Sequence, residues 1–372
     1  MSLLPFFIGV YAVIISSLYF FLPLYLKAGL GFTGVQIGLV YGVLTLTAIL
    51  VSFPVGVTAD RYPARILTRL GLVGIAVSLF LISEVRRFWV FLLVILGSGV
   101  SLQLFRLSLD SLLFKENQTD SFRRFGHYNS WRMGGMMVGI LLGGFLLYYL
   151  DFPRTLKLLG VFILALLFPT SRLPLSPGVR TPLLQYGQDF LSKPVLFFVC
   201  WLFLFTLHWG AEATSLALFL KNNLSLTTRG IGCYMAGEFA MVGLTAYLYG
   251  RFWAGRLKPL QLLTVALLTS GLGHILMTYP SLPWSFSWRL VHGFGDGLIL
   301  METYTTIARL FHVDRIGGNS SLISLTTTLG TFAGSLMFGP IGADCGYAWP
   351  LIISGGISLG LLPLAYLGLR EG

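Results

Sequence analysis

Several residues that can carry charge or bind a proton lie inside long apolar stretches of the second half of the chain. Glu212 and Glu238 occur in two of these stretches, and Arg289, His292 and Asp296 occur together in a third. Ionisable side chains are costly in apolar surroundings, so they usually face a cavity or one another. Desolvation favours the neutral form of a carboxylate, which lets a buried Glu or Asp take up and release a proton. We therefore identify Glu212, Glu238 and Asp296 as candidate proton carriers.

Two further histidines lie in apolar stretches of the second half. His208 precedes Glu212 by four residues and so shares its face of a helix. His274 stands alone in another apolar stretch, where we expect a hydrogen-bonded packing residue rather than a ligand. For any one carboxylate, a structural pair with an arginine is the alternative to proton transfer. The sequence has no Walker, GxSxG or HExxH motif and no Cys/His metal spacing, so we expect neither an enzyme nor an ATP-driven pump, and no metal or cofactor.

A second set of charges lies mainly in the first half. Arg106 and Asp110 are one helical turn apart, and Arg132 and Glu302 are expected at a similar depth in two other helices. A salt-bridged set of Arg106, Asp110 and Arg132 would form a gate or a clamp on a substrate, because unpaired charge is rare at such depth. Alternatively, Asp110 lies at an interface with water and ends its helix.

The composition explains what must position these residues. Hydrophobic residues make up 55% of the 372 positions and charged residues only 10%, against about 25% charged in soluble domains. The solvent for most of this surface must therefore be lipid, and about 20 apolar residues suffice for one helical span. Twelve spans are predicted at roughly 5–27, 35–58, 66–84, 88–113, 127–150, 154–170, 194–220, 230–250, 259–279, 284–309, 317–342 and 347–368.

The longest polar break divides these spans into two sets of six. We predict an N-terminal bundle over 1–170, a linker over 171–193 and a C-terminal bundle over 194–372. Glycines four residues apart recur in the fifth and eleventh spans, which indicates an internal duplication and close helix packing. They are Gly135, Gly139 and Gly143 in the fifth span and Gly330 and Gly334 in the eleventh.

The basic residues predict the orientation. The net charge of +11 is spread over short breaks between apolar runs rather than gathered in one patch, which argues against a nucleic-acid partner. Alternate breaks carry fifteen Lys and Arg on one side and seven on the other. The richer side, with both termini, is expected in the cytoplasm. The chain is thus predicted to be integral to a plasma membrane, or a bacterial inner membrane.

One of these breaks carries a motif. Gly56, Asp60, Arg61 and Arg65 match the spacing G-x-L-A-D-R-x-G-R-R/K-x-x-L, with Leu67 one position before its last leucine, and the segment resembles the signature loop of the major facilitator superfamily. Thr58, Pro63 and Ala64 depart from that pattern. The resemblance implies two pseudo-symmetric six-helix bundles that move a small organic solute by alternating access, with the solute bound near the middle of the membrane. We expect a monomer.

The same resemblance implies a role for the loop. Asp60 is expected to meet the positive N-terminus of the eleventh span, near Gly317 and Gly318, and to latch the two halves together. The alternative is that Asp60, Arg61 and Arg65 only mark topology.

Substrate and direction stay open. Gly126-x8-Gly135-x3-Gly139 resembles the fifth-span motif of antiporters in this superfamily and slightly favours export, although Ile140 replaces its proline. The alternatives are a proton symporter that imports a sugar, a nucleoside or a similar nutrient, and a lipid or lysolipid flippase. Because carboxylates outnumber arginines at span depth, a zwitterion, a neutral polar solute or an organic cation is favoured over an anion. A scaffold or sensor that transports nothing is the alternative from another class.

Overall fold

The structure is a computed structural model that describes residues 3–116, 120–174, 178–256 and 258–368, and every regular element in these ranges is helical. Eleven helical segments among them are long and apolar enough to cross a membrane. The remaining expected span corresponds to α13 (Leu282–Leu310), which has 29 residues but carries Arg289, Asp296 and Glu302 between its ends. The predicted all-α membrane fold is confirmed, and twelve helices agree with it.

The first six predicted spans correspond to helices whose ends follow local signals. They are α1 (Leu4–Tyr19) with α2 (Leu22–Leu24) and the π-helical η1 (Tyr25–Gly29), then α3 (Gly34–Arg61), α4 (Ala64–Glu84), α5 (Phe88–Lys115), α6 (Ser121–Tyr149) and α7 (Phe152–Ala165). Thr33 begins α3 with a capping box, in which its hydroxyl accepts from the Gln36 amide. Asp151 caps α7 by accepting from the Arg154 amide at 2.7 Å.

The linker and the second six spans follow. Two short helices, the 3-10 turn η2 (Pro169–Arg172) and α8 (Leu183–Phe190), lie in the region expected to be a linker. Then come α9 (Lys193–Ala211), η3 (Glu212–Leu216), α10 (Ala217–Asn222), α11 (Thr228–Leu248), η4 (Tyr249–Trp253), α12 (Pro259–Leu276), α13, η5 (Val313–Arg315), α14 (Ile316–Cys345), α15 (Ala348–Gly360) and α16 (Leu362–Gly368). The seventh span is therefore α9, η3 and α10, and its π-helical turn begins at Glu212.

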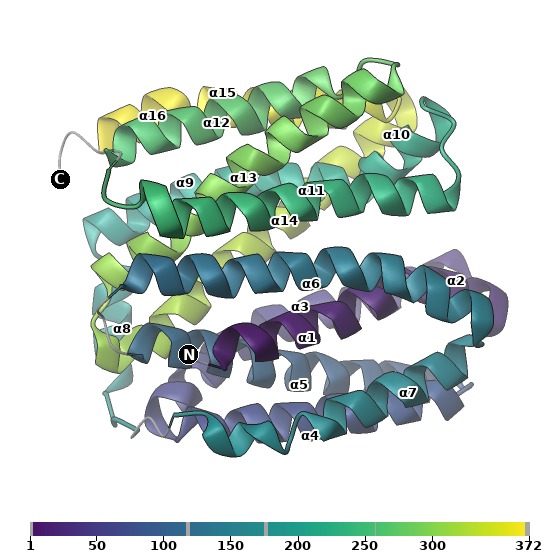
Figure 1. The fold of residues 1–372 in the computed structure, drawn as a ribbon, viewed down its shortest axis with the longest axis horizontal. Helices are drawn as coiled ribbons and strands as arrows, with labels where there is room; N and C mark the ends of the chain where they lie inside the picture. The colour runs from purple at the N-terminus through teal and green to yellow at the C-terminus, as the bar shows by residue number, and fades with distance from the viewer. Residues whose placement is uncertain (1–2, 117–119, 175–177, 257, 369–372) are drawn as a thin grey trace. The chain divides into compact units, whose positions relative to one another are not determined.

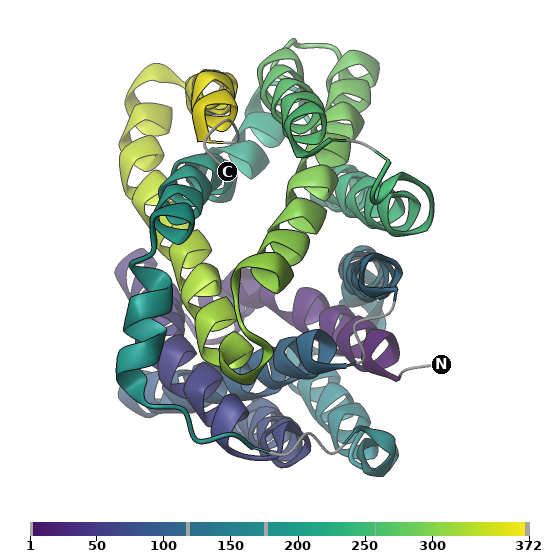
Figure 2. The same cartoon turned by 90° about the vertical axis from the view of Figure 1, so that its left-hand side faces the viewer.

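Contacts between Cα atoms divide the chain into two compact units. Unit 1 comprises Met1–Thr119, Val138–Tyr186 and Phe311–Leu325, and unit 2 comprises the rest. In unit 1, α5 packs against α3 and α4, and α4 packs against α7. In unit 2, α13 packs against α11 and α12, and α15 packs against α9 and α12 (Figures 1 and 2). Both units are discontinuous in sequence, so the predicted boundaries at 1–170, 171–193 and 194–372 stay a prediction.

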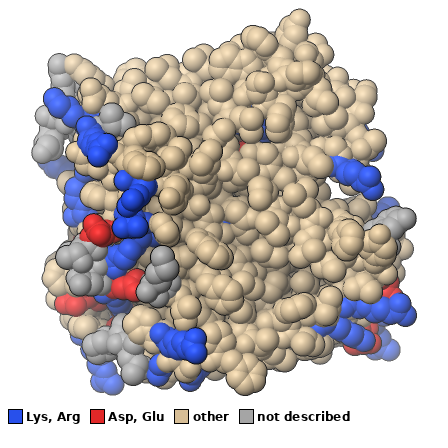
Figure 3. Space-filling model, viewed as in Figure 1, with Lys and Arg blue, Asp and Glu red and all other residues tan. Residues whose placement is uncertain are grey.

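The surface has the character expected of a protein in lipid. On the face drawn in Figure 3, Lys, Arg, Asp and Glu gather near the ends of the helices, and the broad area between them is almost free of charge. Large apolar side chains such as Leu50, Leu93 and Phe145 are exposed within their helices. Exposed apolar side chains in such number need a lipid environment.

Candidate functional site

Ionisable side chains from four consecutive spans meet inside unit 2. We call this group the polar cluster; it comprises His208, Glu212, Glu238, His274, Arg289, His292 and Asp296. Its members are almost completely buried: the Glu212 side chain is 13% exposed, and the others are at most 7% exposed. Charged groups in such surroundings persist only when other charges or hydrogen bonds compensate them.

Helix geometry and close packing bring the polar cluster together. Arg289, His292 and Asp296 are spaced three and four residues apart, which puts them on one face of α13. Glycines let α12 approach that face: a Cβ atom on Gly273 would lie 2.6 Å from the His292 amide nitrogen, and one on Gly295 would lie 2.6 Å from the Ala266 carbonyl oxygen. Larger residues at these two positions would push α13 and its charges away from α12.

Arg289 joins two of the carboxylates. Its guanidinium is fully buried and donates to both oxygens of Glu212 and to one oxygen of Glu238. Forked contacts of this kind suit the planar geometry of arginine. Glu212 is further contacted by His292, whose Nε2 lies 3.0 Å from Oε1.

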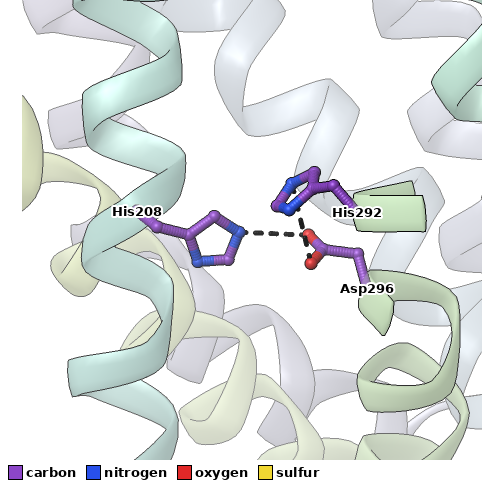
Figure 4. A group of neighbouring side chains, drawn as sticks. All are labelled: His208, His292 and Asp296. Atoms are coloured by element: carbon purple, nitrogen blue, oxygen red, sulfur yellow. Dashed lines mark hydrogen bonds and ion pairs between the residues drawn. The ribbon is translucent and has the colours of Figure 1, made fainter. Parts of the chain in front are cut away.

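Asp296 has a separate set of partners (Figure 4). Its Oδ2 accepts from the Trp209 indole at 2.9 Å and lies 3.1 Å from His208 Nε2, and its Oδ1 accepts from the Ser270 hydroxyl at 2.7 Å. His208 reaches the carboxylate from α9, whereas His292 extends from the same helix as Asp296. Among the described residues, the partners of Asp296 are thus indole, hydroxyl and imidazole groups.

His274 is hydrogen-bonded, as expected, and it also lies within the polar cluster. Its Nε2 lies 3.4 Å from Glu212 Oε1, and its ring stacks on that of His292 with a centroid separation of 4.7 Å. His208 completes a trio, with its ring centroid 5.4 Å from each of the other two. The sequence could not show this, because the rotation of α12 about its axis decides which neighbour His274 meets.

The polar cluster carries more negative than positive groups. Glu212, Glu238 and Asp296 contribute three carboxylates and Arg289 one guanidinium, so the formal charge is +1 − 3 = −2 when the three histidines are neutral. An uncompensated charge of this size is costly in an apolar interior. The site can therefore bind cations, either protons or a positively charged ligand.

A second site lies in unit 1 around Asp60. The carboxylate is fully buried and accepts from the amides of Gly317 at 2.9 Å and Gly318 at 2.7 Å, in the first turn of α14. Lys115 Nζ lies 2.9 Å away, and the Tyr186 hydroxyl donates at 3.1 Å. The contact expected between Asp60 and the eleventh span is thus present, with the carboxylate at the positive end of a helix. Its role in gating stays a prediction.

The arginines of this loop bind backbone carbonyls within η2 and after it. Arg61 donates to the Thr181 carbonyl at 3.1 Å, and Arg65 donates to the Ser171 carbonyl at 2.6 Å. Gly56 lets α3 and α14 cross closely, since a Cβ atom there would lie 2.6 Å from Ser321 Cβ. Burial and the nearby Asp60 carboxylate raise the pKa of the Tyr186 phenol, so it stays a hydrogen-bond donor.

The second predicted set of charges comprises Arg106, Asp110, Arg132 and Glu302. The contacts described for Arg106 lie within unit 1, and those described for Glu302 lie within unit 2. Arg106 donates to Gln103 at 3.0 Å and to Ser324 at 2.7 Å, both within unit 1. Asp110 is 7% exposed, one turn further along α5. Arg132 belongs to unit 2, and its pairing with the other two stays a prediction.

Glu302 has partners on its own helix. It accepts from the hydroxyls of Thr305 and Thr306 on its own helix and lies 3.5 Å from Arg309. It lines a cavity of about 960 Å³ in unit 2, together with Lys193 and Lys258. Glu302 is thus neutralised mainly within α13.

The sequence profile of the Major Facilitator Superfamily matches residues 6–262, which is more than half of the chain. The chain belongs to the Major Facilitator Superfamily. Comparison of the sequence with curated proteins gives no match. Members of this superfamily are transporters rather than enzymes, in agreement with the expectation from the sequence.

Solved structures of transporters share the fold over nearly the whole chain. The human organic anion transporter MFSD10 (TETRAN) has a TM-score of 0.78 at 17% identity, over 97% of this chain and 96% of that one. A bacterial homologue of the iron transporter ferroportin, in an outward-facing state, has a TM-score of 0.74 at 18% identity, over 99% and 98%. The superfamily transporter FucP, in the outward conformation, has a TM-score of 0.76 at 12% identity, over 98% and 97%. Identities this low show the fold alone.

The sequence of this superfamily member revealed its two candidate sites, the signature loop and the polar cluster, to different extents. The signature loop was recognisable from its spacing, because its residues are contiguous. The polar cluster was only partly recognisable: charge in apolar runs indicated its carboxylates, but not that Arg289 binds two of them or that His208 and His274 join them. The spacing of Arg289, His292 and Asp296 on one helix face was the available signal.

Proposed function

We propose that this superfamily transporter couples the movement of a small organic solute to protons through the polar cluster. The observation that supports the proposal is the formal charge of −2 on buried carboxylates within reach of three histidines. Glu212, Glu238 and Asp296 face groups from every helix packed around them: His208 and Trp209 on α9, Ser270 and His274 on α12, and Arg289 and His292 on α13. Protons that enter this site reduce its charge, and protons that leave restore the carboxylates.

We infer the class of solute from the same excess of negative charge. A zwitterion, a neutral polar solute or an organic cation suits such a site better than a simple anion. The glycines of α6 favour export slightly: Gly139 and Gly143 pack against α1, where Cβ atoms on them would lie within 3 Å of Val13 and Ser17. Close packing of this kind serves either direction, so import of a nutrient stays the second candidate.

Asp60 would act as the latch in this scheme. Its charge lies at the N-terminus of α14 and is neutralised by Lys115 and two backbone amides. Breaking these contacts would leave the carboxylate and two backbone amides without their partners. The free-energy cost of doing so would stabilise the closed arrangement at this end. The basic excess on this side supports a cytoplasmic location for it and for both termini, in a plasma membrane or a bacterial inner membrane.

A binding screen tests the solute class. Thermal unfolding of the detergent-purified protein would be followed with sugars, nucleosides, amino acids, amphipathic cations and lysolipids, at two pH values. A ligand at about 100 times its Kd stabilises by about 2.7 kcal/mol, which such a screen detects. Polar nutrients as hits would support import, and cationic amphiphiles would support export. Stabilisation by lysolipids alone would overturn the soluble-solute proposal in favour of lipid transport.

A further inference from the structure

The hydrogen bonds of two histidines fix which of their ring nitrogens faces the carboxylates. His208 Nδ1 lies 2.6 Å from the Phe205 carbonyl oxygen, and His292 Nδ1 lies 2.9 Å from the Ser270 carbonyl oxygen. A carbonyl oxygen only accepts, so in each case Nδ1 carries the hydrogen. In the neutral form of each ring, Nε2 then presents a lone pair. His208 Nε2 is directed toward Asp296 (Figure 4), whereas His292 Nε2 lies between Asp296 and Glu212. Histidines that bind metals are typically oriented in this way, by an Nδ1–H bond to a carbonyl.

A lone pair facing an ionised carboxylate needs a cation between them. His208 Nε2 lies 3.1 Å from Asp296 Oδ2, and His292 Nε2 lies 3.8 Å from Oδ1. His292 Nε2 is fully buried and lies 3.0 Å from Glu212 Oε1 without the alignment of a hydrogen bond. An atom of this kind, directed at carboxylates from inside the protein, is explained by a ligand that both groups share.

The spacing of these atoms suits a small transition-metal ion. The three ligand atoms of His208, His292 and Asp296 all lie within 4.8 Å of one another. Zinc bonds of about 2.1 Å in a tetrahedral site put neighbouring ligand atoms about 3.4 Å apart, between the two separations above. Three protein ligands leave one position of a tetrahedral site for a water molecule.

We propose that His208, His292 and Asp296 bind a divalent transition-metal ion, with Zn²⁺ as the best match. Two imidazoles favour Zn²⁺, Fe²⁺, Co²⁺ or Ni²⁺ over Mg²⁺ and Ca²⁺, which prefer oxygen ligands. The double positive charge of the ion balances the formal charge of −2 on the polar cluster. The binding site stands independently of the proposed function; only a role for the ion as a transported or coupling species would rest on it.

A second group of possible metal ligands also contains His292, but the structure favours the group of His208, His292 and Asp296. Glu212, His274 and His292 also place their ligand atoms within 4.8 Å of one another. There, however, Arg289 already occupies both oxygens of Glu212, and His274 Nδ1 contacts the Ser354 hydroxyl rather than a carbonyl. A hydroxyl can donate or accept, so it does not fix which nitrogen of His274 is free. His274 is therefore the matched buried control.

Equilibrium dialysis of Zn²⁺ against the detergent-purified chain tests the proposal. The protein would lack an affinity tag, and its three exposed cysteines would be replaced by serine to remove thiol ligands. We expect about one Zn²⁺ per chain, a Co²⁺ derivative with the absorption of a four-coordinate site, and no displacement by excess Mg²⁺. His208→Gln and Asp296→Asn should each weaken Zn²⁺ binding at least about tenfold.

Two control variants make the assignment specific. His312→Gln changes an exposed histidine 3.4 Å from Asp314, a surface pair of similar chemistry, and should leave binding unchanged. His274→Gln should also retain binding. Absence of Zn²⁺ binding by the wild type, or binding that survives both His208→Gln and Asp296→Asn, would overturn the proposal. Loss of binding in His274→Gln alone would overturn the choice of ligands.

Folding and transport are separated from binding in this design. Gel filtration and thermal unfolding without metal show whether a variant is folded, and Asp296→Asn keeps the shape of that side chain while one accepting oxygen becomes a donating amide nitrogen. If His208→Gln does not fold, Asp296→Asn and the Co²⁺ spectrum of the wild type decide the question. Metal binding at this site in a chain that transports no solute would contradict the proposed function and leave this inference intact.

Discussion

Arg289 stabilises two buried carboxylates at once, and this makes it the most sensitive single residue of the polar cluster. Its fully buried guanidinium contacts Glu212 and Glu238. Removing one partner of a buried ion pair costs about 3–5 kcal/mol, because the remaining charge is left uncompensated. We expect Arg289→Gln to lower the free energy of unfolding by about that amount, measured by thermal or denaturant unfolding in detergent.

Arg154 offers a matched control for this prediction. It pairs with Asp151 at 3.5 Å, but its side chain is 75% exposed. Exposed pairs contribute little, so Arg154→Gln should leave unfolding unchanged. An equal effect of the two substitutions would show that Arg289 is not the buried counter-charge described above.

At the residue scale, the sequence predicted identities better than partners. Glu212, Glu238 and Asp296 were recognisable because charge inside an apolar run is costly and rare. Which residues neutralise them depends on helix rotation and on side-chain geometry across four helices. For the same reason, the sequence did not predict that His208 and His292 could share a metal ion. The proposed ligands come from separate helices, so no short spacing motif identifies them.

At the element scale, the crossing of α3 and α14 depends on Gly56. A methyl group there would meet Ser321 Cβ at 2.6 Å, whereas a Cβ atom on Gly38 of the same helix would meet nothing within 4 Å. Gly38→Ala should stabilise the protein by about 0.5–1 kcal/mol through helix propensity. Gly56→Ala should destabilise it by about 1–3 kcal/mol through overpacking. Thermal unfolding measures both, and effects of the same sign would contradict this description of the crossing.

The latch at Asp60 belongs to the same pair of helices. Asp60→Asn keeps the size of the side chain but removes the charge that binds Lys115 and the first turn of α14. We expect this end to open more often in the variant. To measure this, Ser320, which is 6% exposed, would be replaced by cysteine in a protein that lacks its native cysteines. This cysteine should react with a thiol reagent several-fold faster when Asp60→Asn is present than when Asp60 is retained.

The outcome of this labelling experiment separates the two interpretations of the loop. Faster labelling in Asp60→Asn supports a latch. Equal rates with and without the substitution would show that Asp60 is a topology marker whose contacts do not control opening.

Helix ends were predictable where a capping residue precedes an apolar run, as at Thr33 and Asp151. The π-helical turn that begins at Glu212 was not. This turn inserts a residue into the seventh span, and its own residues, Glu212–Leu216, include no proline or glycine. Such turns are frequent at functional sites, and this one begins at a residue of the polar cluster.

At the scale of the whole molecule, the apolar composition was enough to predict an all-α membrane protein. Lipid offers no hydrogen-bond partners to the backbone, and a helix is one of the few structures that satisfy every backbone hydrogen bond internally. The tenth span was predicted in spite of its charges, because its length and flanking breaks match those of the others. The division into compact units could not be predicted, because contacts group Phe311–Leu325, at the start of α14, with unit 1.

Proton coupling through the polar cluster is the central claim, and proteoliposomes test it most directly. A solute identified by the binding screen would be added to vesicles that contain a pH-sensitive dye, for the wild type, Glu238→Gln and the surface control Glu84→Gln. The prediction is that solute movement changes the internal pH in the wild type and in Glu84→Gln, and that Glu238→Gln abolishes the pH change. Solute transport without any pH change in the wild type, or an unaltered pH change in Glu238→Gln, would contradict the claim.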